Sequence, residues 1–468
     1  MAGPPAKRTF GSWELGQRKR LGVITIPIDV DVSEHLFRRE SGRLVSALTR
    51  IFGVHNLALA EDVVQDAFCR ALEVWKVRGV PDNPSGWLMA VARNRALDIV
   101  RRQRTARTFA PELTRVLESE WTLASTVEEA FATATIRDEQ LRMMFSCCDP
   151  RVPEETQVAL VLNILCGFGA GEIASAFLIG RAAVEKRLSR GKKALASSRR
   201  LFDLSTADLG PRLSAVQRAL YLLFSEGYHS ASIDAAVRSD LCNEAMRLAT
   251  LLLEAPDARR PDTYALAALM CLQAARLPAR LDAAGDLASL LDQNRLQWDS
   301  QLISDGLALL DRSAEGTTVS SYHLEAAIAA AHVSAPDVAQ THWDAIVLLY
   351  DRLMAVAPSP VVALNRAIAI GQRDGPGRGL EELRGIRESE RLARYPFFPA
   401  AIGEFEQRRG RVAVARQLFL EAAALARNPA EQRFLEKRAR ECDSRGAEAT
   451  EETGSQTGQR GSGDERGQ

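Results

Sequence analysis

Apolar residues recur at helical spacing along most of the 468-residue chain. In the segment from Ala60 to Trp75 they return every three to four residues, which predicts an amphipathic helix. Its apolar stripe consists of Val63, Val64, Ala67, Phe68, Ala71, Leu72 and Trp75. Runs of β-branched residues, which are typical of strands, are scarce. We therefore expect an all-α protein.

A second helix is expected to start at Asn83-Pro84, because asparagine is a favourable N-cap and proline suits the first helical position. Further along, residues 171–177 predict a short helix, residues 178–180 a turn, and residues 181–195 another helix. This is the spacing of a helix-turn-helix motif. The positions expected to face inward are Ile173, Ala174, Phe177, Val184, Leu188 and Leu195.

The segment from Arg212 to Cys442 is rich in alanine and leucine and is interrupted by prolines, which is typical of short antiparallel helices. A repeat is visible within it at a constant offset of 36 residues. The corresponding positions are Pro360, Ala367, Gly379 and Leu383 in one copy and Pro396, Gly403, Ala415 and Phe419 in the next. The period is close to the roughly 34 residues of tetratricopeptide helix pairs.

Charge is balanced over the whole chain but not along it. Basic and acidic residues both number 60, so a surface that binds a polyanion must come from local segregation of charge. Residues 91–110 carry a net charge of +5 and residues 181–200 a net charge of +7, whereas residues 111–180 between them carry −7. The pattern predicts two basic modules joined by an acidic linker.

The seven cysteines are odd in number and show no Cys-x-x-Cys spacing, which argues against a disulfide scaffold and against a zinc site. The apolar stretch from Leu21 to Ile28 is short and is broken by Thr25 and Pro27, so it is unlike the core of a signal peptide. No apolar run approaches the roughly 18 residues of a membrane span. We expect a cytoplasmic protein with no membrane contact, no metal and no other cofactor.

Two polar helix faces carry candidate binding chemistry. Opposite the apolar stripe of the first helix lie Asp62, Gln65 and Asp66. On the second helix, amide, carboxylate and guanidinium groups share one side, formed by Asn94, Asp98, Arg101 and Arg102. Amide and guanidinium groups suit nucleotide edges and phosphates. In each case an ordinary solvated helix face is the alternative, and we expect Trp75 and Trp87 to pack in the core rather than to stack on bases.

The second helix of the helix-turn-helix segment is also basic. With Val184 and Leu188 facing inward, Arg181, Lys186 and Arg190 would point outward. The start of such a helix could then meet bases, and its basic end could follow the phosphate backbone. A charged surface helix in a bundle is the alternative. The turn, the charge asymmetry and the second basic module favour DNA binding.

These motifs resemble those of extracytoplasmic-function sigma factors, a group of the sigma-70 family of bacterial RNA polymerase subunits. The segments similar to their second conserved region are 59–68, 83–88, 92–94 and 97–102. Those similar to the fourth region are 172–174, Val184 and 187–190. Segments 141–150, 220–228, 292–299 and 322–332 resemble the group that carries a tetratricopeptide-like C-terminal extension. The resemblance covers about residues 33 to 440.

The resemblance assigns roles to the candidate residues. Asp62, Gln65 and Asp66 would dock on the clamp helices of the RNA polymerase β′ subunit, and the β flap would be a further contact on the polymerase. The minus-10 promoter element would be read and melted by Asn94, Asp98, Arg101 and Arg102. The loop Val77 to Gly86 would border a flipped base. The minus-35 duplex would be contacted in its major groove by Arg181, Lys186, Arg187 and Arg190.

The expected organisation has six parts. They are a flexible segment over 1–31, a region 2 domain over 32–108, an acidic linker over 109–136, a region 4 helix-turn-helix domain over 137–204, a helical-repeat regulatory extension over 205–442 and a disordered tail over 443–468.

The expected function is that of a sigma factor, which binds core RNA polymerase and promoter DNA and is regulated by its C-terminal domain. That domain could itself take a regulatory protein or peptide. The alternative is a helix-turn-helix transcriptional regulator with a ligand- or peptide-binding helical domain. An enzyme would have to use groups such as Glu226, Tyr228 and His229, but the chain has no phosphate-binding glycine loop and no nucleophile elbow. We therefore expect no catalytic residues.

Overall fold

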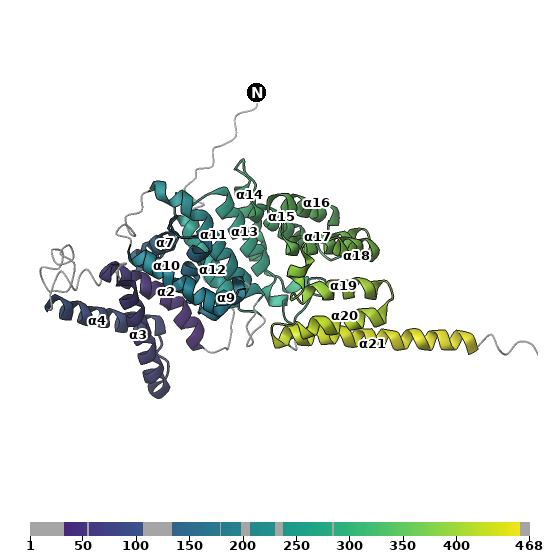
Figure 1. Cartoon of the computed structure of the whole chain (residues 1–468), viewed down its shortest axis with the longest axis horizontal. Coiled ribbons are helices and arrows are strands. Elements are labelled where there is room, and N and C mark those ends of the chain that lie inside the picture. The colour runs from purple at the N-terminus through teal and green to yellow at the C-terminus, as the bar shows by residue number, and fades with distance from the viewer. Residues whose placement is uncertain are drawn as a thin grey trace, which may run out of the picture.

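A computed structural model describes residues 32–53, 56–105, 133–177, 179–197, 206–229, 237–282 and 285–458. In these ranges the chain is helical and has no strand beyond an isolated bridge between Leu281 and Leu287. The expectation of an all-α fold is confirmed. Figure 1 shows an elongated molecule, with the first helices at one end and the last helix at the other.

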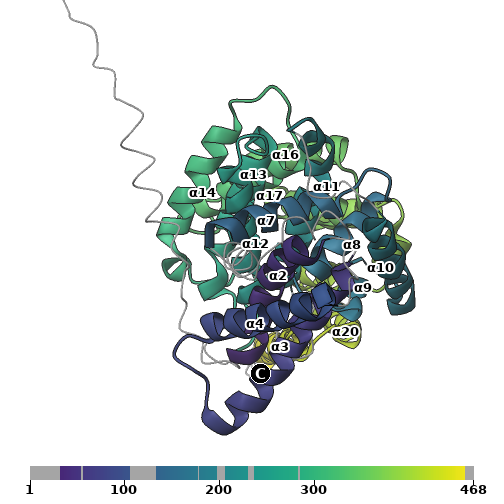
Figure 2. The same cartoon turned by 90° about the vertical axis from the view of Figure 1, so that its left-hand side faces the viewer.

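The first module contains α2 (Val32–Phe52), α3 (Leu57–Arg78) and α4 (Pro84–Thr105), which pack on one another (Figure 2). Most of the predicted stripe of α3 is buried, from Val63 to Trp75. Leu72 is the exception and corrects the prediction, because it is 53 % exposed. Each residue turns a helix by about 100°, so Leu72, four residues after Phe68, lies slightly further round the helix than Phe68 does. Phe68 is half-buried at the edge of the stripe, and Leu72 lies beyond that edge.

The start of α4 follows the prediction. The side-chain Oδ1 of Asn83 accepts a hydrogen bond from the backbone N–H of Gly86 at 2.9 Å, and Pro84 is the first helical residue. The cap satisfies one of the backbone donors that every helix leaves unpaired at its start.

The second module contains α7 (Thr133–Cys147), α8 (Glu154–Ile164), α9 (Ala170–Phe177) and α10 (Arg181–Ala196). Helices α9 and α10 occupy the two segments predicted as a helix-turn-helix. Of the positions expected to face inward, Ile173, Ala174, Val184, Leu188 and Leu195 are buried and Phe177 is half-buried. A Cβ at Gly191 would lie 2.8 Å from the Thr156 side chain, so glycine allows α10 to approach α8 closely.

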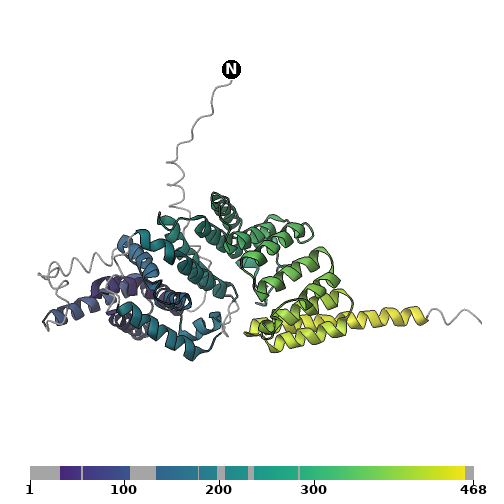
Figure 3. The same ribbon diagram turned by 45° about the horizontal axis from the view of Figure 1, so that its top comes forward.

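The C-terminal extension begins with α11 and forms the larger part of the molecule (Figure 3). Its longer helices are α11 (Thr206–Tyr228), α12 (Ser239–Glu254), α13 (Pro261–Ala274), α14 (Ser300–Ser313), α15 (Ser321–Ser334), α16 (Trp343–Val356), α17 (Pro360–Arg373), α18 (Pro376–Arg384), α19 (Phe397–Arg408), α20 (Val412–Ala424) and α21 (Pro429–Gly458). Its short 3₁₀ helices are η2 (Leu277–Ala279), η3 (Arg295–Gln297) and η4 (Ser389–Leu392).

The two copies of the 36-residue pattern form two helix pairs, α17 with α18 and α19 with α20. All the aligned positions after the prolines are buried: Ala367, Gly379 and Leu383 in the first pair, and Gly403, Ala415 and Phe419 in the second. The pairs meet around Phe405, whose ring would lie 2.5 Å from a Cβ at Gly379. A small residue of the pattern, Gly379, therefore leaves space for the ring of Phe405. Membership of the tetratricopeptide class stays a prediction.

The three parts share one hydrophobic core. A single cluster of buried apolar residues runs from Leu36 in α2 through the helix-turn-helix module to Leu302 in α14. The contact between modules is close, because a Cβ at Gly42 of α2 would lie 2.1 Å from the carbonyl oxygen of Leu165. The modules are thus packed against one another in this structure.

The structure bears on the expected boundaries in two places. Helix α7 begins at Thr133, before the expected start of the second domain at 137, and α21 continues to Gly458, past the expected start of the disordered tail at 443. Residues 1–31, residues 106–108 of the expected region 2 domain, residues 109–132 of the expected linker and residues 459–468 lie outside the described residues.

Candidate polymerase and nucleic-acid interface

The acidic face of α3 is exposed as predicted. Asp62, Gln65 and Asp66 all point away from the buried stripe. Asp66 also forms an ion pair with Arg95 of α4, with 3.2 Å between carboxylate and guanidinium. Both partners are largely exposed, so the pair contributes little to stability and can exchange for other partners.

On α4, Asn94, Asp98, Arg101 and Arg102 are all exposed. Their neighbours Ala92, Ala96 and Val100 are fully buried, which fixes the orientation of the helix. The structure therefore presents the predicted minus-10 residues together on one solvent-facing surface, next to the acidic face of α3. Arg95, which is also exposed, links the two surfaces through Asp66.

The loop predicted from Val77 to Gly86 is shorter in the structure, because α3 continues to Arg78 and α4 begins at Pro84. Large apolar side chains are exposed at the end of α3 and in this loop. Val77 is 84 % exposed and Val80 is 52 % exposed. Exposed apolar residues beside a basic surface are suited to contact a base or a protein partner. Trp75, by contrast, packs in the core at 5.7 Å from the ring of Phe37 and 5.5 Å from the ring of Trp87. The prediction that Trp75 packs in the core is thus confirmed.

The basic face of α10 separates into two groups. Arg181, Lys186 and Arg190 are exposed, as predicted. Arg187 is only 25 % exposed, because its guanidinium pairs with Glu155 of α8 at 3.0 Å and lies over the ring of Phe177. The structure therefore places Arg187 between helices, apart from the other three predicted minus-35 residues.

A charged junction that the sequence did not indicate joins all three parts. Glu172, at the start of α9, is bound by Arg38 of α2 at 3.0 Å and by Arg238, just before α12, at 2.8 Å. Arg38 and Arg238 are nearly buried. Burial acts to raise the pKa of Glu172, but the charge of Arg38 and hydrogen bonds from both arginines outweigh it and hold the pKa below its usual value.

Two further ion pairs link the first two modules. Arg50 of α2 pairs with buried Glu139 of α7 at 2.7 Å, and Lys192 of α10 pairs with Glu61 of α3 at 2.5 Å. Glu61 directly precedes the predicted polymerase-binding residues. The helix-turn-helix module therefore contacts α3 at the edge of that face.

Several titratable groups of the extension and of α7 are withdrawn from solvent. Glu226 and Tyr228 are buried, and burial together with nearby Arg276 and Arg295 lowers the pKa of His332 to about 3. Burial raises the pKa of the thiols of Cys147 and Cys271 to about 12. Within the described ranges, no group of three or more His, Cys, Asp or Glu side chains could hold a metal ion.

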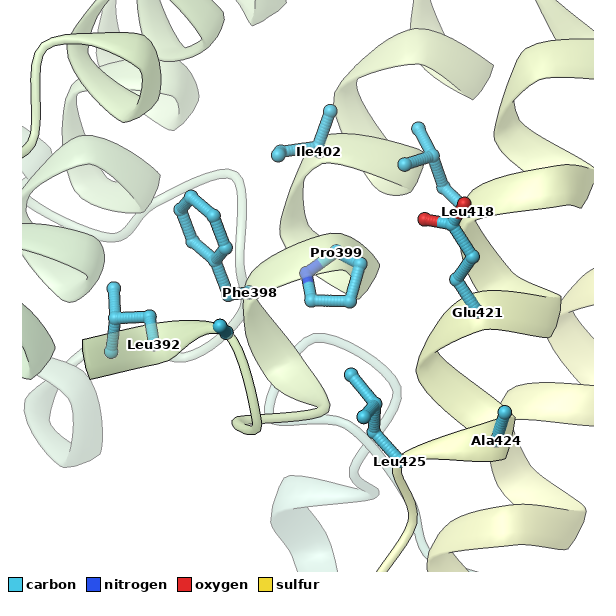
Figure 4. A pocket seen from close by; sticks show the side chains of 9 residues that line it. Leu392, Phe398, Pro399, Ile402, Leu418, Glu421, Ala424 and Leu425 are labelled. Atoms are coloured by element: carbon cyan, nitrogen blue, oxygen red, sulfur yellow. The ribbon is translucent and has the colours of Figure 1, made fainter. Parts of the chain in front are cut away.

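A pocket of about 420 Å³ lies among η4, α19 and α20 (Figure 4). Its wall is apolar apart from Glu421, and it is lined by residues such as Phe398, Ile402 and Leu425. None of the predicted site residues lies on it. No helix among the described residues is long and apolar enough to cross a membrane.

Residues 36–106, which comprise most of α2 and all of α3 and α4, match the family Sigma-70 region 2. The chain therefore contains a sigma-70 region 2 domain, which supports a sigma-70 family factor. Such factors bind core RNA polymerase for the initiation of transcription and are not enzymes, which fits the expected absence of catalysis. The match contains the exposed faces of both α3 and α4.

The other comparisons give relatives of unknown role. Residues 212–314, from α11 to the end of α14, match a family of unknown function, DUF6596. The chain is 39 % identical over 394 residues to the uncharacterized protein R00370 of Rhizobium meliloti (strain 1021), over 84 % of this chain and 91 % of that protein. It belongs to the same family as that protein. No solved structure matches the chain.

Proposed function

We propose that the chain is an extracytoplasmic-function type sigma factor that docks on the β′ clamp helices through α3. In this proposal Asn94, Asp98, Arg101 and Arg102 of α4 bind the minus-10 element, and the exposed basic residues of α10 bind the minus-35 duplex. The observation that carries the proposal is the adjacency of two exposed polar faces within the region 2 match, one acidic and one basic. An acidic face suits a protein partner, and a basic one suits single-stranded DNA.

Run-off transcription with core RNA polymerase and genomic DNA tests this proposal. The full chain should direct discrete transcripts that core polymerase alone does not make, and the double variant Arg101→Ala/Arg102→Ala should lose them. The matched control is Arg408→Ala/Arg409→Ala, which removes two adjacent exposed arginines from α19 and its C-cap. Transcripts that survive in the Arg101/Arg102 variant would refute the assignment. A repressor of the alternative class would give no core-dependent transcripts.

We further propose that the extension regulates the factor by holding the two DNA-binding modules together. The names of the two promoter elements place them about 25 base pairs apart, roughly 85 Å at 3.4 Å per base pair. Arg38 of region 2 and Glu172 of α9 are in direct contact, so the two modules must separate before both elements can be bound. Arg238 supplies the contact from the extension. Breaking the junction should therefore favour the open, DNA-binding arrangement.

The test uses single substitutions in the full chain, because the shared core makes truncation disruptive. Glu172→Gln removes the charge but keeps the oxygen that accepts a hydrogen bond from the N–H of Gly169. With fluorophores on α4 and α10, energy transfer should fall in this variant relative to wild type. Asp311→Asn, an exposed carboxylate on α14, is the matched control. Equal transfer in all three proteins would contradict the regulatory proposal.

A further inference from the structure

A pair of arginines in the extension takes no part in the proposed sigma-factor activity. Arg276 follows α13 and Arg280 follows η2, and both lie over the ring of Tyr228 at the end of α11. The guanidinium carbons are 5.5 Å and 4.9 Å from the ring centre. Tyr228 itself is buried, so the two side chains share one fixed aromatic support.

Neither arginine has an acidic ion-pair partner among the described residues. Among the residues that the structure describes, no carboxylate lies within ion-pair distance of Arg276 or Arg280, and the Nε atoms of both are buried without a hydrogen-bond acceptor. Besides lying over Tyr228, the Arg280 guanidinium contacts the ring Nδ1 of His229 at 3.0 Å. A partly buried guanidinium without a counter-ion is costly, because it loses water and gains no compensating charge.

The surrounding groups do not supply the missing charge. The nearby carboxylate of Glu431 is bound by Arg427 at 2.5 Å. Buried His332 is neutral near pH 7. Arg295 adds positive charge and donates to the backbone oxygen of His332. Burial lowers the pKa of Arg280 and so does the charge of Arg276, and together they outweigh the opposite effects of Tyr228, Glu431 and Tyr395. Among the described residues, the cluster therefore holds two guanidinium groups that have no ion-pair partner.

Solvent can reach this place. Arg276 and Arg280 are half-buried, and the side chain of His229 beside them is exposed. A guanidinium presents its N–H groups as a planar fork that fits two oxygens of one oxyanion. Two such forks on one support match a group with several oxygens and about two negative charges.

We propose that Arg276 and Arg280 form a binding site for a small dianionic oxyanion, a phosphate or phosphomonoester group or a dicarboxylate. Tyr228 holds the two forks in place, and His229 provides one further polar contact. A singly charged ion leaves one guanidinium uncompensated and binds more weakly. This site does not depend on the binding of polymerase or DNA, so its existence can be tested separately.

Isothermal titration calorimetry of the full chain at low ionic strength tests the site, with inorganic phosphate, glycerol 3-phosphate, succinate and acetate as separate probes. At least one of the three dianionic probes should bind saturably, and acetate should bind at least about tenfold more weakly. Comparison of the phosphate probes with succinate identifies the preferred oxyanion. Arg276→Met and Arg280→Met should each weaken binding of the preferred probe by about tenfold or more, which is the range expected for the loss of one charge-assisted contact.

Arg408→Met is the matched control, because Arg408 also lies over an aromatic ring, that of Phe405, and should leave affinity unchanged. The melting temperature of each Met variant in anion-free buffer shows whether the arginine binds the anion or stabilises the fold. Because each substitution removes one of two repelling charges, the melting temperature should stay unchanged or rise. The proposal is overturned if no dianion binds saturably, if both Met variants bind as well as wild type, or if they melt markedly lower than the control.

Discussion

The outer face of region 2 and the junction at Glu172 are both built from charged side chains, but they differ in what surrounds them. On α3 and α4 the charges stand in water, where an ion pair such as Asp66–Arg95 contributes little. At the junction, Arg38 and Arg238 are nearly buried and share the carboxylate of Glu172, and Arg238 also pairs with Asp240 at 3.7 Å. Exposed charges are available to partners, whereas enclosed ones hold the modules together.

The largest expected effect comes from the junction. Glu172→Ala removes the carboxylate that nearly buried Arg38 and Arg238 share, so it should lower the free energy of unfolding by about 2–4 kcal/mol. Chemical denaturation of the full chain measures it. Asp66→Ala, which breaks the exposed pair, should cost less than about 0.5 kcal/mol. Similar losses in the two variants would remove the distinction between the two regions.

The next effect sharpens the comparison within a single helix. The logarithm of the DNA-binding constant falls linearly with the logarithm of salt concentration. Arg181→Ala and Arg190→Ala should each make this slope shallower by about 0.9, because each exposed arginine can neutralise one phosphate. Arg187→Ala should change the slope less and the melting temperature more, since Arg187 binds Glu155 and covers Phe177. A salt titration of promoter binding beside a thermal melt checks both. Equal slope changes for all three arginines would place Arg187 in the DNA interface after all.

The smallest effect concerns pH. Because the folded-state pKa of Glu172 is depressed, its charge stabilises the protein above the unfolded pKa of about 4.5, and this contribution is lost as pH falls through the lower folded value. Glu172→Gln should therefore have a lower free energy of unfolding than wild type near pH 7. The difference in free energy of unfolding between the two proteins should become smaller below about pH 4.5. Denaturation curves at several pH values measure it. A difference that is constant with pH would show that the carboxylate charge is irrelevant.

The sequence was informative where structure depends on local spacing. The periodicity and the Asn83 cap predicted α3 and α4, and the helix-turn-helix spacing predicted α9 and α10. These signals lie within one or two helices, because burial of one helix side sets the pattern. They also sufficed to place the candidate residues of α3 and α4 in solvent.

What the sequence missed depends on distant partners. Arg38 and Arg238 lie 134 and 66 residues from Glu172 in the chain, and no local pattern brings them together. The same holds for Arg187, whose partner Glu155 belongs to another helix. Leu72 was misplaced because the extent of the partner helices, and not the period of α3, decides what the edge of a stripe contacts.

The affinity of the chain for core RNA polymerase tests the central claim most directly. The variant Asp62→Ala/Gln65→Ala/Asp66→Ala should lose measurable binding while keeping the helicity and melting temperature of wild type, because all three side chains are exposed. The control Gln301→Ala/Asp311→Ala/Glu315→Ala removes the same set of exposed groups from α14 and the loop that follows it and should bind as wild type does. A triple variant on α3 that is folded and binds core polymerase with unchanged affinity would contradict the account.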